Sequence, residues 1–175
     1  RRQRQMCIRD RLIDKGVYCH PRVARVALAA KLPGGRNAGT VVDEPVCLLD
    51  LAPTILEAAG VKPSARLDGV SLWPLLRGER KLEREAIFWH YPHYSNQGGR
   101  PGCSVRAGDY KLIEFFEDHH LELYHLRDDI GEDHDLAAAE PLVARHLQAR
   151  LHEGLQDVGA KIPEPNPDWE PRDDG

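Results

Sequence analysis

Residues 103–126 hold three short strand-like runs separated by two groups of turn-forming residues. Cys103–Arg106, Tyr110–Phe116 and Leu121–Leu126 have the branched and aromatic content of strands. Residues 107–109 and 117–120 are small or polar, and they predict turns. The segment is therefore predicted to fold as an antiparallel sheet. One face of such a sheet needs an apolar cover.

The cover is predicted to be a helix within residues 136–160. Pro141 suits the first turn of a helix, where its missing N–H group costs no hydrogen bond. Apolar residues follow at spacings of three and four, which is the repeat of one helical face. The predicted stripe consists of Leu142, Val143, His146, Leu147, Leu151, Leu155 and Val158.

Three further elements are predicted upstream of the sheet. The apolar run Val23–Lys31 is long enough for one buried strand, and Ala86–His90 is a second strand. A helix is predicted to begin at Asp50 and to end at Gly60. The Asp50 carboxyl group is interpreted as the helix cap rather than as a catalytic acid. The expected buried stripe of this helix consists of Leu51, Ile55, Ala58 and Ala59.

Composition limits the class of protein. With 175 residues, the chain can form one sizeable core or two small domains. The formal charge of -4 argues against a nucleic-acid partner. No apolar run approaches the ~20 residues of a membrane helix. The four cysteines lack the paired spacing of a disulfide framework or a zinc site.

The first 11 residues do not resemble the rest of the chain. The hexapeptide Met6–Arg11 back-translates in frame to part of a transposase adaptor used in sequencing-library preparation. Residues 1–11 are therefore predicted to be an artefact and are excluded from fold reasoning. The alternative is a natural basic N-terminal arm.

Three ordered motifs identify a family resemblance. Arg106-Ala107-Gly108-Asp109-Tyr110-Lys111-Leu112, Glu122-Leu123-Tyr124-His125-Leu126 and the segment 128–136 resemble the sulfatase patterns R-x-G-x-Y-K-L, E-L-Y-x-L and D-P-x-E-x-x-N-L. In the third motif, Ile130 replaces the usual proline and Asp135 the usual asparagine. The helix at residues 50–60 is similar to the family pattern D-L-x-P-T-L-L-x-x-A-G. The resemblance covers about Lys15 to Pro167.

The resemblance implies an α/β fold in two parts. Residues 12–80 would form the C-terminal end of an alkaline-phosphatase-like catalytic domain, and 86–162 a small α+β subdomain with an antiparallel sheet and a C-terminal helix. Residues 163–175 would be an irregular tail. Sulfatases hydrolyse aryl or carbohydrate sulfate esters with a formylglycine nucleophile and a calcium ion. Both are expected upstream of this chain, so the chain alone is expected to be inactive and to hold no metal.

Within this chain the resemblance assigns a sulfate contact to Lys15. An ammonium group offers a compact charge to a sulfate oxygen. The alternative is a solvated surface lysine. Cys19-His20-Pro21-Arg22 resembles the formylglycine motif, but its arginine comes one position early and the motif follows Lys15. Cys19 is therefore rejected as the nucleophile.

His90 and His93 are the predicted substrate-binding residues. Both lie at the end of a predicted strand, next to a loop rich in glycine and polar residues. Histidines in such a place suit hydrogen bonding to a sugar. The alternative is that the aromatic residues around them pack the subdomain and the histidines lie at its rim. The acidic residues Asp128, Asp129, Glu132, Asp133 and Asp135 are interpreted as a solvated turn.

Two alternative functions remain open from sequence. One is a phosphodiesterase or phosphonate hydrolase of the same superfamily, and the other is a non-catalytic binding module. A sulfate ester is the expected partner, without nucleic acid or a membrane segment. A periplasmic or secreted location is suspected from the family alone.

Overall fold

The computed structural model describes residues 26–79, 81–94, 99–164 and 166–167. These residues form two compact units. The first, Ala27–Ile87, is called the helical unit, and the second, which begins at Phe88, is called the sheet unit.

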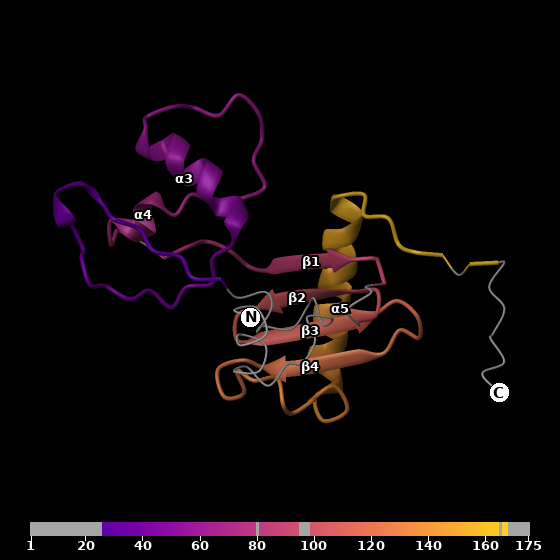
Figure 1. The fold of residues 1–175 in the computed structure, drawn as a ribbon. Helices are drawn as coiled ribbons and strands as arrows, with labels where there is room; N and C mark the ends of the chain where they lie inside the picture. The colour runs from indigo at the N-terminus through magenta and orange to yellow at the C-terminus, as the bar shows by residue number, and fades with distance from the viewer. Residues whose placement is uncertain (1–25, 80, 95–98, 165, 168–175) are drawn as a thin grey trace, which may run out of the picture. The chain divides into compact units, whose positions relative to one another are not determined.

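The sheet unit contains four strands in the order β1-β2-β3-β4. They are β1 (Ile87–Tyr91), β2 (Gly102–Ala107), β3 (Tyr110–Phe115) and β4 (Leu121–His125). Neighbouring arrows run in opposite directions in Figure 1. The three strands predicted between residues 103 and 126 are confirmed. Gly108 lies in the β2–β3 turn with φ +59°, a backbone conformation that favours glycine.

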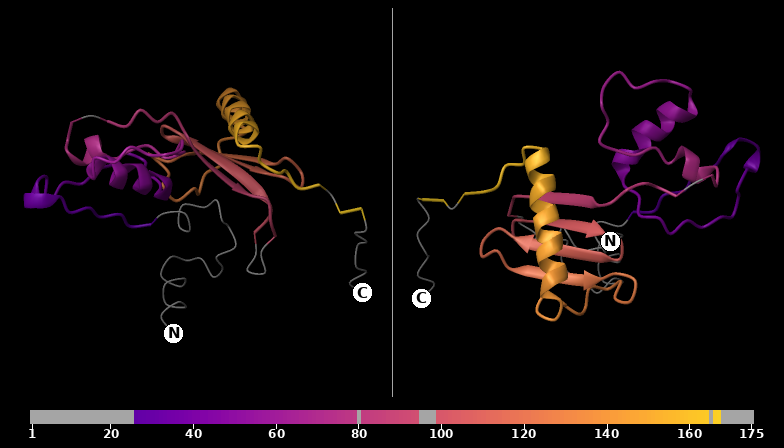
Figure 2. Two further views of the ribbon diagram at one scale, coloured as in Figure 1. Left: turned by 90° about the horizontal axis from the view of Figure 1, so that it is seen from above. Right: turned by 180° about the vertical axis from the view of Figure 1, so that it is seen from behind.

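Helix α5 (Pro141–Asp157) crosses one face of this sheet, as the two views of Figure 2 show. The strand register places Leu112 of β3 opposite Val105 of β2 and Leu123 of β4. All three are fully buried, and α5 contributes Ala144, Leu147, Leu151 and Leu155 to the same core. The prediction that the C-terminal helix covers the sheet is therefore confirmed.

The predicted stripe of α5 is wrong in part. Leu142 and Val158 are 78% and 73% exposed, and His146 is exposed as well. Successive helical residues are rotated by about 100°, so Leu142 and His146 lie on the side opposite Leu151. Val158 follows the last helical residue. Spacings of three and four fit any face of a helix. The predicted stripe was counted from Leu142, which lies on the solvent-exposed face.

A close approach between β1 and α5 depends on Gly154. A Cβ atom at this position would lie 2.8 Å from Cε1 of Phe88. The Phe88 ring therefore packs directly against the backbone of α5, in space that any other residue at position 154 would fill.

The sheet face opposite α5 holds a buried ion pair. Nζ of Lys111 donates to Oε1 of Glu132 at 2.7 Å, and both side chains are at most 5% exposed. Burial raises the pKa of Glu132 and outweighs the opposing attraction of Lys111. The interpretation of Glu132 as part of a solvated turn is therefore wrong. Its partner lies 21 residues earlier in the chain, so local sequence could not reveal the pair.

Other acidic residues of this segment organise the backbone. The Asp135 carboxylate accepts the N–H groups of Leu123, in β4, and Ala137. Asp129 accepts the N–H groups of Asp133 and His134, and the first of these bonds makes the largest contribution to the lowered pKa of Asp129. Together with the Lys111 ion pair, these contacts join the three motifs found in the sequence.

The helical unit contains two 3₁₀ turns, η1 (Pro33–Gly35) and η2 (Leu48–Asp50), and two short helices, α3 (Leu51–Ala58) and α4 (Trp73–Leu76). Helix α3 confirms the helix predicted between residues 50 and 60. The strand predicted at 23–31 is wrong over its described part, because residues 26–31 contain no strand and are mostly exposed. A strand needs a hydrogen-bonded neighbour, and none lies beside these residues within the described ranges.

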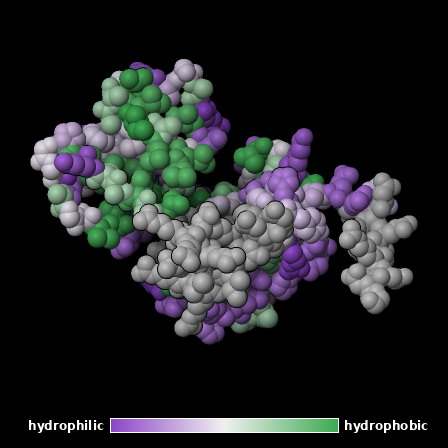
Figure 3. Space-filling view, viewed as in Figure 1, coloured by the Kyte–Doolittle hydropathy of each residue, from purple (hydrophilic) through white to green (hydrophobic). Residues whose placement is uncertain are grey.

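Apolar side chains of the helical unit are largely exposed. Ile55 is 65% exposed, so the predicted buried stripe of α3 is wrong, and Thr54 is the buried residue of this helix. Leu48 and Leu49 of η2 are also more than 60% exposed. Figure 3 shows hydrophobic residues gathered over this unit. Burial of apolar side chains therefore contributes little to the stability of this unit.

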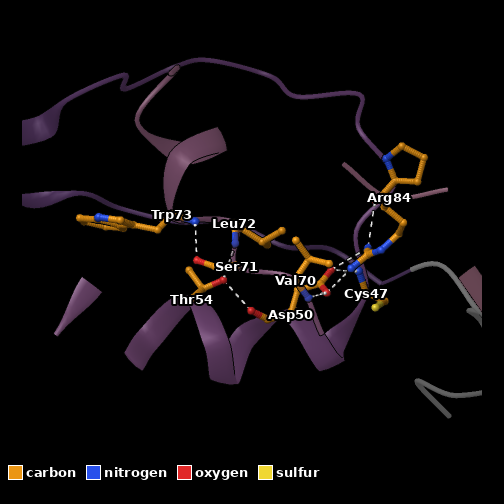
Figure 4. A network of polar contacts seen from close by, with 9 residues as sticks. Cys47, Asp50, Thr54, Val70, Ser71, Leu72, Trp73 and Arg84 are labelled. Atoms are coloured by element: carbon orange, nitrogen blue, oxygen red, sulfur yellow. Dashed lines mark hydrogen bonds and ion pairs between the residues drawn. The ribbon is translucent and has the colours of Figure 1, made fainter. Parts of the chain in front are cut away.

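Polar contacts of the Asp50 carboxylate, which is 0% exposed, hold the segments of the helical unit together (Figure 4). This carboxylate accepts the N–H groups of Cys47 at 2.8 Å and Val70 at 2.9 Å, and both oxygens bond to the Arg84 guanidinium. Burial alone would raise the pKa of Asp50, but the bonds from Arg84 and the two N–H groups together lower it. Asp50 makes no side-chain cap to α3, so the capping prediction is wrong. It instead closes the turn η2 and pairs with a residue 34 positions away.

Thr54 extends this network. Its hydroxyl donates to the Asp50 carbonyl at 2.5 Å and accepts the Leu72 N–H at 2.7 Å. The segment that leads into α4 is thereby bonded to α3. Among the described helices, none combines the length and apolar character needed to cross a bilayer.

Candidate functional site

Lys15, the predicted sulfate contact, lies outside the described residues, as do Cys19 and its neighbours. The described part of the predicted site is the end of β1 and the residues just after it. The start of β2 and the end of β3 lie at this same end of the sheet (Figure 1), where Gly102 is paired with Phe115.

His90 is half-buried in β1. Its Nε2 lies 3.0 Å from the carbonyl oxygen of Lys161, and its ring meets Phe116 edge-on at 5.6 Å. Since a carbonyl oxygen only accepts, Nε2 donates in this contact, and Nδ1 is the other ring nitrogen. That Nδ1 atom is buried without a hydrogen-bond partner among the described residues. The substrate-binding role of His90 stays a prediction.

His93 is exposed and follows β1 by two residues. Its ring meets Tyr91 edge-on, with the centroids 5.6 Å apart and the planes at 86°. His90 and His93 thus contact different neighbours, and no described contact joins them. An exposed imidazole next to an aromatic ring can donate to or accept from a sugar hydroxyl. Its role in binding substrate likewise stays a prediction.

A stack of three side chains lies beside the β3–β4 turn, and sequence reasoning missed it. The Arg100 guanidinium lies 4.2 Å from the centroid of the Phe115 ring, and His120 stacks on the same ring at 6.0 Å. Arg100 also donates to Asp118 at 3.1 Å. The pKa of Asp118 is lowered, first by the N–H of His120 and then by Arg100. Continuing the β2–β3 pairing as far as Arg100 would have predicted that Arg100 lies beside the β3–β4 turn.

Glu117, in the same turn, contacts two residues of the chain between β1 and β2. It accepts the Tyr94 hydroxyl on Oε1 at 2.7 Å, and its Oε2 lies 3.5 Å from Nε of Arg100. The bond to Glu117 is the first cause of the raised pKa of Tyr94, so this phenol stays protonated. The site therefore combines histidine and tyrosine rings with a mixed set of charges. Such groups suit a polar, hydroxyl-rich ligand.

The described residues do not fit a calcium ion or a formylglycine. No group of three histidine, cysteine or carboxylate side chains in the described ranges could hold a metal. Cys47 is part-buried, and burial followed by the charge of Asp50 raises the pKa of its thiol, while Cys103 is fully buried. A raised pKa at Cys47 and complete burial at Cys103 are both unlike a reactive cysteine.

Comparison with known proteins identifies the family. The model of N-sulphoglucosamine sulphohydrolase, C-terminal, matches residues 10–161. The chain belongs to the sulfatase family. A sulfatase of Formosa agariphila is 36% identical over 141 residues, which are 74% of this chain and 25% of that protein. This C-terminal sulfatase region thus spans about a quarter of the length of the relatives that it matches.

Two solved structures carry the same fold. One is BT4656 in complex with its substrate D-glucosamine-2-N,6-O-disulfate, with a TM-score of 0.56 and 30% identity. It is matched over 65% of this chain and 24% of its own. The other is a phosphonate monoester hydrolase of Silicibacter pomeroyi, with a TM-score of 0.55 and 26% identity over 70% of this chain and 27% of its own. The sulfatase resemblance seen in the motifs is confirmed, and so is the relation to the wider superfamily.

Proposed function

We propose that this chain is the C-terminal part of an enzyme that hydrolyses sulfate esters of carbohydrates. The support comes from the family match over 152 residues, from 10 to 161, and from the sulfated glucosamine bound by a relative of the same fold. Calcium and formylglycine chemistry, as the resemblance implies, would come from the three quarters of the relatives' length that this chain does not span.

Two roles are proposed for residues of this chain. The Lys15 ammonium would contact a sulfate oxygen and stabilise the charge that moves onto the sulfate oxygens in the transition state. His93 would bind the sugar that carries the sulfate. Its exposure and its position directly after β1 support this role. His90 would contribute a second polar group, although its Nε2 already bonds to Lys161.

The test compares variants of the full-length enzyme by the release of inorganic sulfate. Lys15→Ala should lower kcat on every sulfate ester by on the order of 10²-fold, because it removes one transition-state contact. His93→Ala should instead raise KM for some sugar sulfates and leave 4-nitrophenyl sulfate unaffected. Lys62→Ala, at an exposed lysine of the helical unit, is the matched control. Wild-type kinetics in Lys15→Ala would mean that Lys15 is a surface residue.

A phosphonate or phosphodiester hydrolase is the second candidate. The similarity to a phosphonate monoester hydrolase favours it, because its TM-score nearly equals that of the sulfatase structure. A phosphonate monoester and a sulfated glucosamine should therefore be offered to the same preparation. A higher kcat/KM on the phosphonate would reject the sulfatase proposal. The absence of turnover on both would favour a binding module.

A further inference from the structure

Helix α3 and the turn η2 before it carry an apolar face that is exposed in the described chain. Leu48, Ala52, Ile55 and Ala59 follow one another at spacings of four, three and four, so they lie along one side of the helix. Leu48 and Ile55 are each 65% exposed, and Ala52 and Ala59 are exposed as well. Leu49, the residue after Leu48, is 63% exposed. These five residues are called the α3 face.

The polar groups of α3 lie on other sides of the helix. Thr54 is buried, and its hydroxyl bonds the helix to the N–H of Leu72 at 2.7 Å. Glu57, the one charged residue between 51 and 60, is exposed and lies about 200° around the helix from Ile55. A helix at the surface of a complete domain has the opposite arrangement, with its apolar side inward and its polar side toward water. The α3 face is therefore suited to contact with another apolar surface.

The helical unit has little core of its own. Within its described part, only Leu72, Pro74 and Ile87 are buried apolar residues. Hydrophobic residues gather on the outside of the unit instead, as Figure 3 shows. Apolar patches of this kind mark places where a soluble protein binds another surface. A patch without charged residues, such as the α3 face, resembles a domain core cut in half, which is typical of permanent contacts.

We propose that the α3 face packs, in the whole enzyme, against the part of the same protein that precedes this chain. The matching family model is that of a C-terminal part, and the chain spans 25% of the Formosa agariphila sulfatase. Most of such an enzyme therefore lies before this region, and it can complete the core that the helical unit lacks. A second copy of the chain and the sheet unit are the competing occupants.

Hydroxyl-radical footprinting of the wild-type full-length enzyme tests whether the α3 face is covered. Leu142 of α5 is the matched control, because it is a leucine of this chain with a comparable exposure of 78%. Leu48 and Leu49 should be oxidised about tenfold more slowly than Leu142, since the core of an interface excludes water. Oxidation of all three leucines at equal rates would overturn the inference.

Photo-cross-linking of the full-length enzyme identifies the occupant. Ile55→p-benzoylphenylalanine should cross-link to peptides that precede this chain, and Ala59→p-benzoylphenylalanine offers a second position on the same face. A cross-link to residues 88–175 would identify the sheet unit, and a cross-linked dimer would identify a second copy. Either result would overturn the proposal. Neither measurement depends on turnover, so failure of the proposed sulfatase function would leave both results unchanged.

Discussion

Replacing Asp50 by asparagine is the sharpest test of how the helical unit is held together. The substitution keeps the size of the side chain and removes its charge. In the native protein the carboxylate receives N–H groups from Cys47, Val70 and Arg84. An asparagine at this position has one acceptor oxygen, so its NH₂ group must face one of these donors. The Arg84 side chain, only 11% exposed, loses its counter-ion.

The expected cost follows from these contacts. Removing one partner of a buried ion pair costs about 3–5 kcal/mol, because the other charge stays buried. Since each 1.4 kcal/mol is a factor of ten, opening of the unit should become roughly 10²- to 4 × 10³-fold more frequent. The clearest reporters are the amides of Val70 and Leu72, which bond to Asp50 and Thr54.

Native-state hydrogen exchange at these two amides is the assay, with Asp43→Asn at an exposed position as control. The pH dependence gives a second check. The pKa of Asp50 is lowered in the folded state, so its contribution is present above the unfolded carboxyl pKa of about 3.9 and is lost as pH falls through the folded value. The deficit of Asp50→Asn should therefore be constant from pH 8 to about 5 and shrink below about 4. Wild-type protection of Val70 in the variant would refute the reasoning.

Three further predictions concern the sheet unit and the whole chain. Lys111→Met should cost about 3–5 kcal/mol in denaturant unfolding, and adding Glu132→Leu should recover most of it, because the pair is buried; a double variant less stable than either single one would contradict this. Gly154→Ala should destabilise the wild type by about 1 kcal/mol, because the Phe88 ring occupies the space of the new methyl group. In a Phe88→Ala background the same change should stabilise by up to about 1 kcal/mol, because alanine has the higher helix propensity. A change in unfolding free energy of the same sign in both backgrounds would refute the contact. The 175-residue chain alone should neither turn over 4-nitrophenyl sulfate nor bind calcium tightly, because it spans about a quarter of the length of the sulfatases that it matches; sulfate release by this chain would disprove the prediction.

Local patterns predicted the elements whose formation depends on near neighbours. The strands between residues 103 and 126 follow from alternating residue types and turn chemistry, and Gly108 confirms the turn. Helix α5 follows from its spacing. The run at residues 26–31 shows the limit of such patterns, since apolar composition alone does not supply a neighbouring strand.

Side-chain partners far apart in sequence were beyond reach. Asp50 looked like a helix cap because aspartate suits that position, yet its partner Arg84 follows 34 residues later. Glu132 looked solvated among other acids until the fold placed Lys111 beside it. For the candidate site, motifs led to His90 and His93 at the end of β1, whereas the contacts of Glu117 required the register of two strands.

The polar network around Asp50 has a calorimetric consequence. Within the described part of the helical unit, only three apolar residues are buried, Leu72, Pro74 and Ile87, beside the buried polar residues Asp50 and Thr54. Exposure of apolar surface raises the heat capacity on unfolding, whereas exposure of polar surface lowers it. Melting of this unit should therefore absorb heat with little change in heat capacity, and its stability curve should be unusually flat with temperature. Cooling should then weaken this unit less than it weakens the leucine core beneath α5.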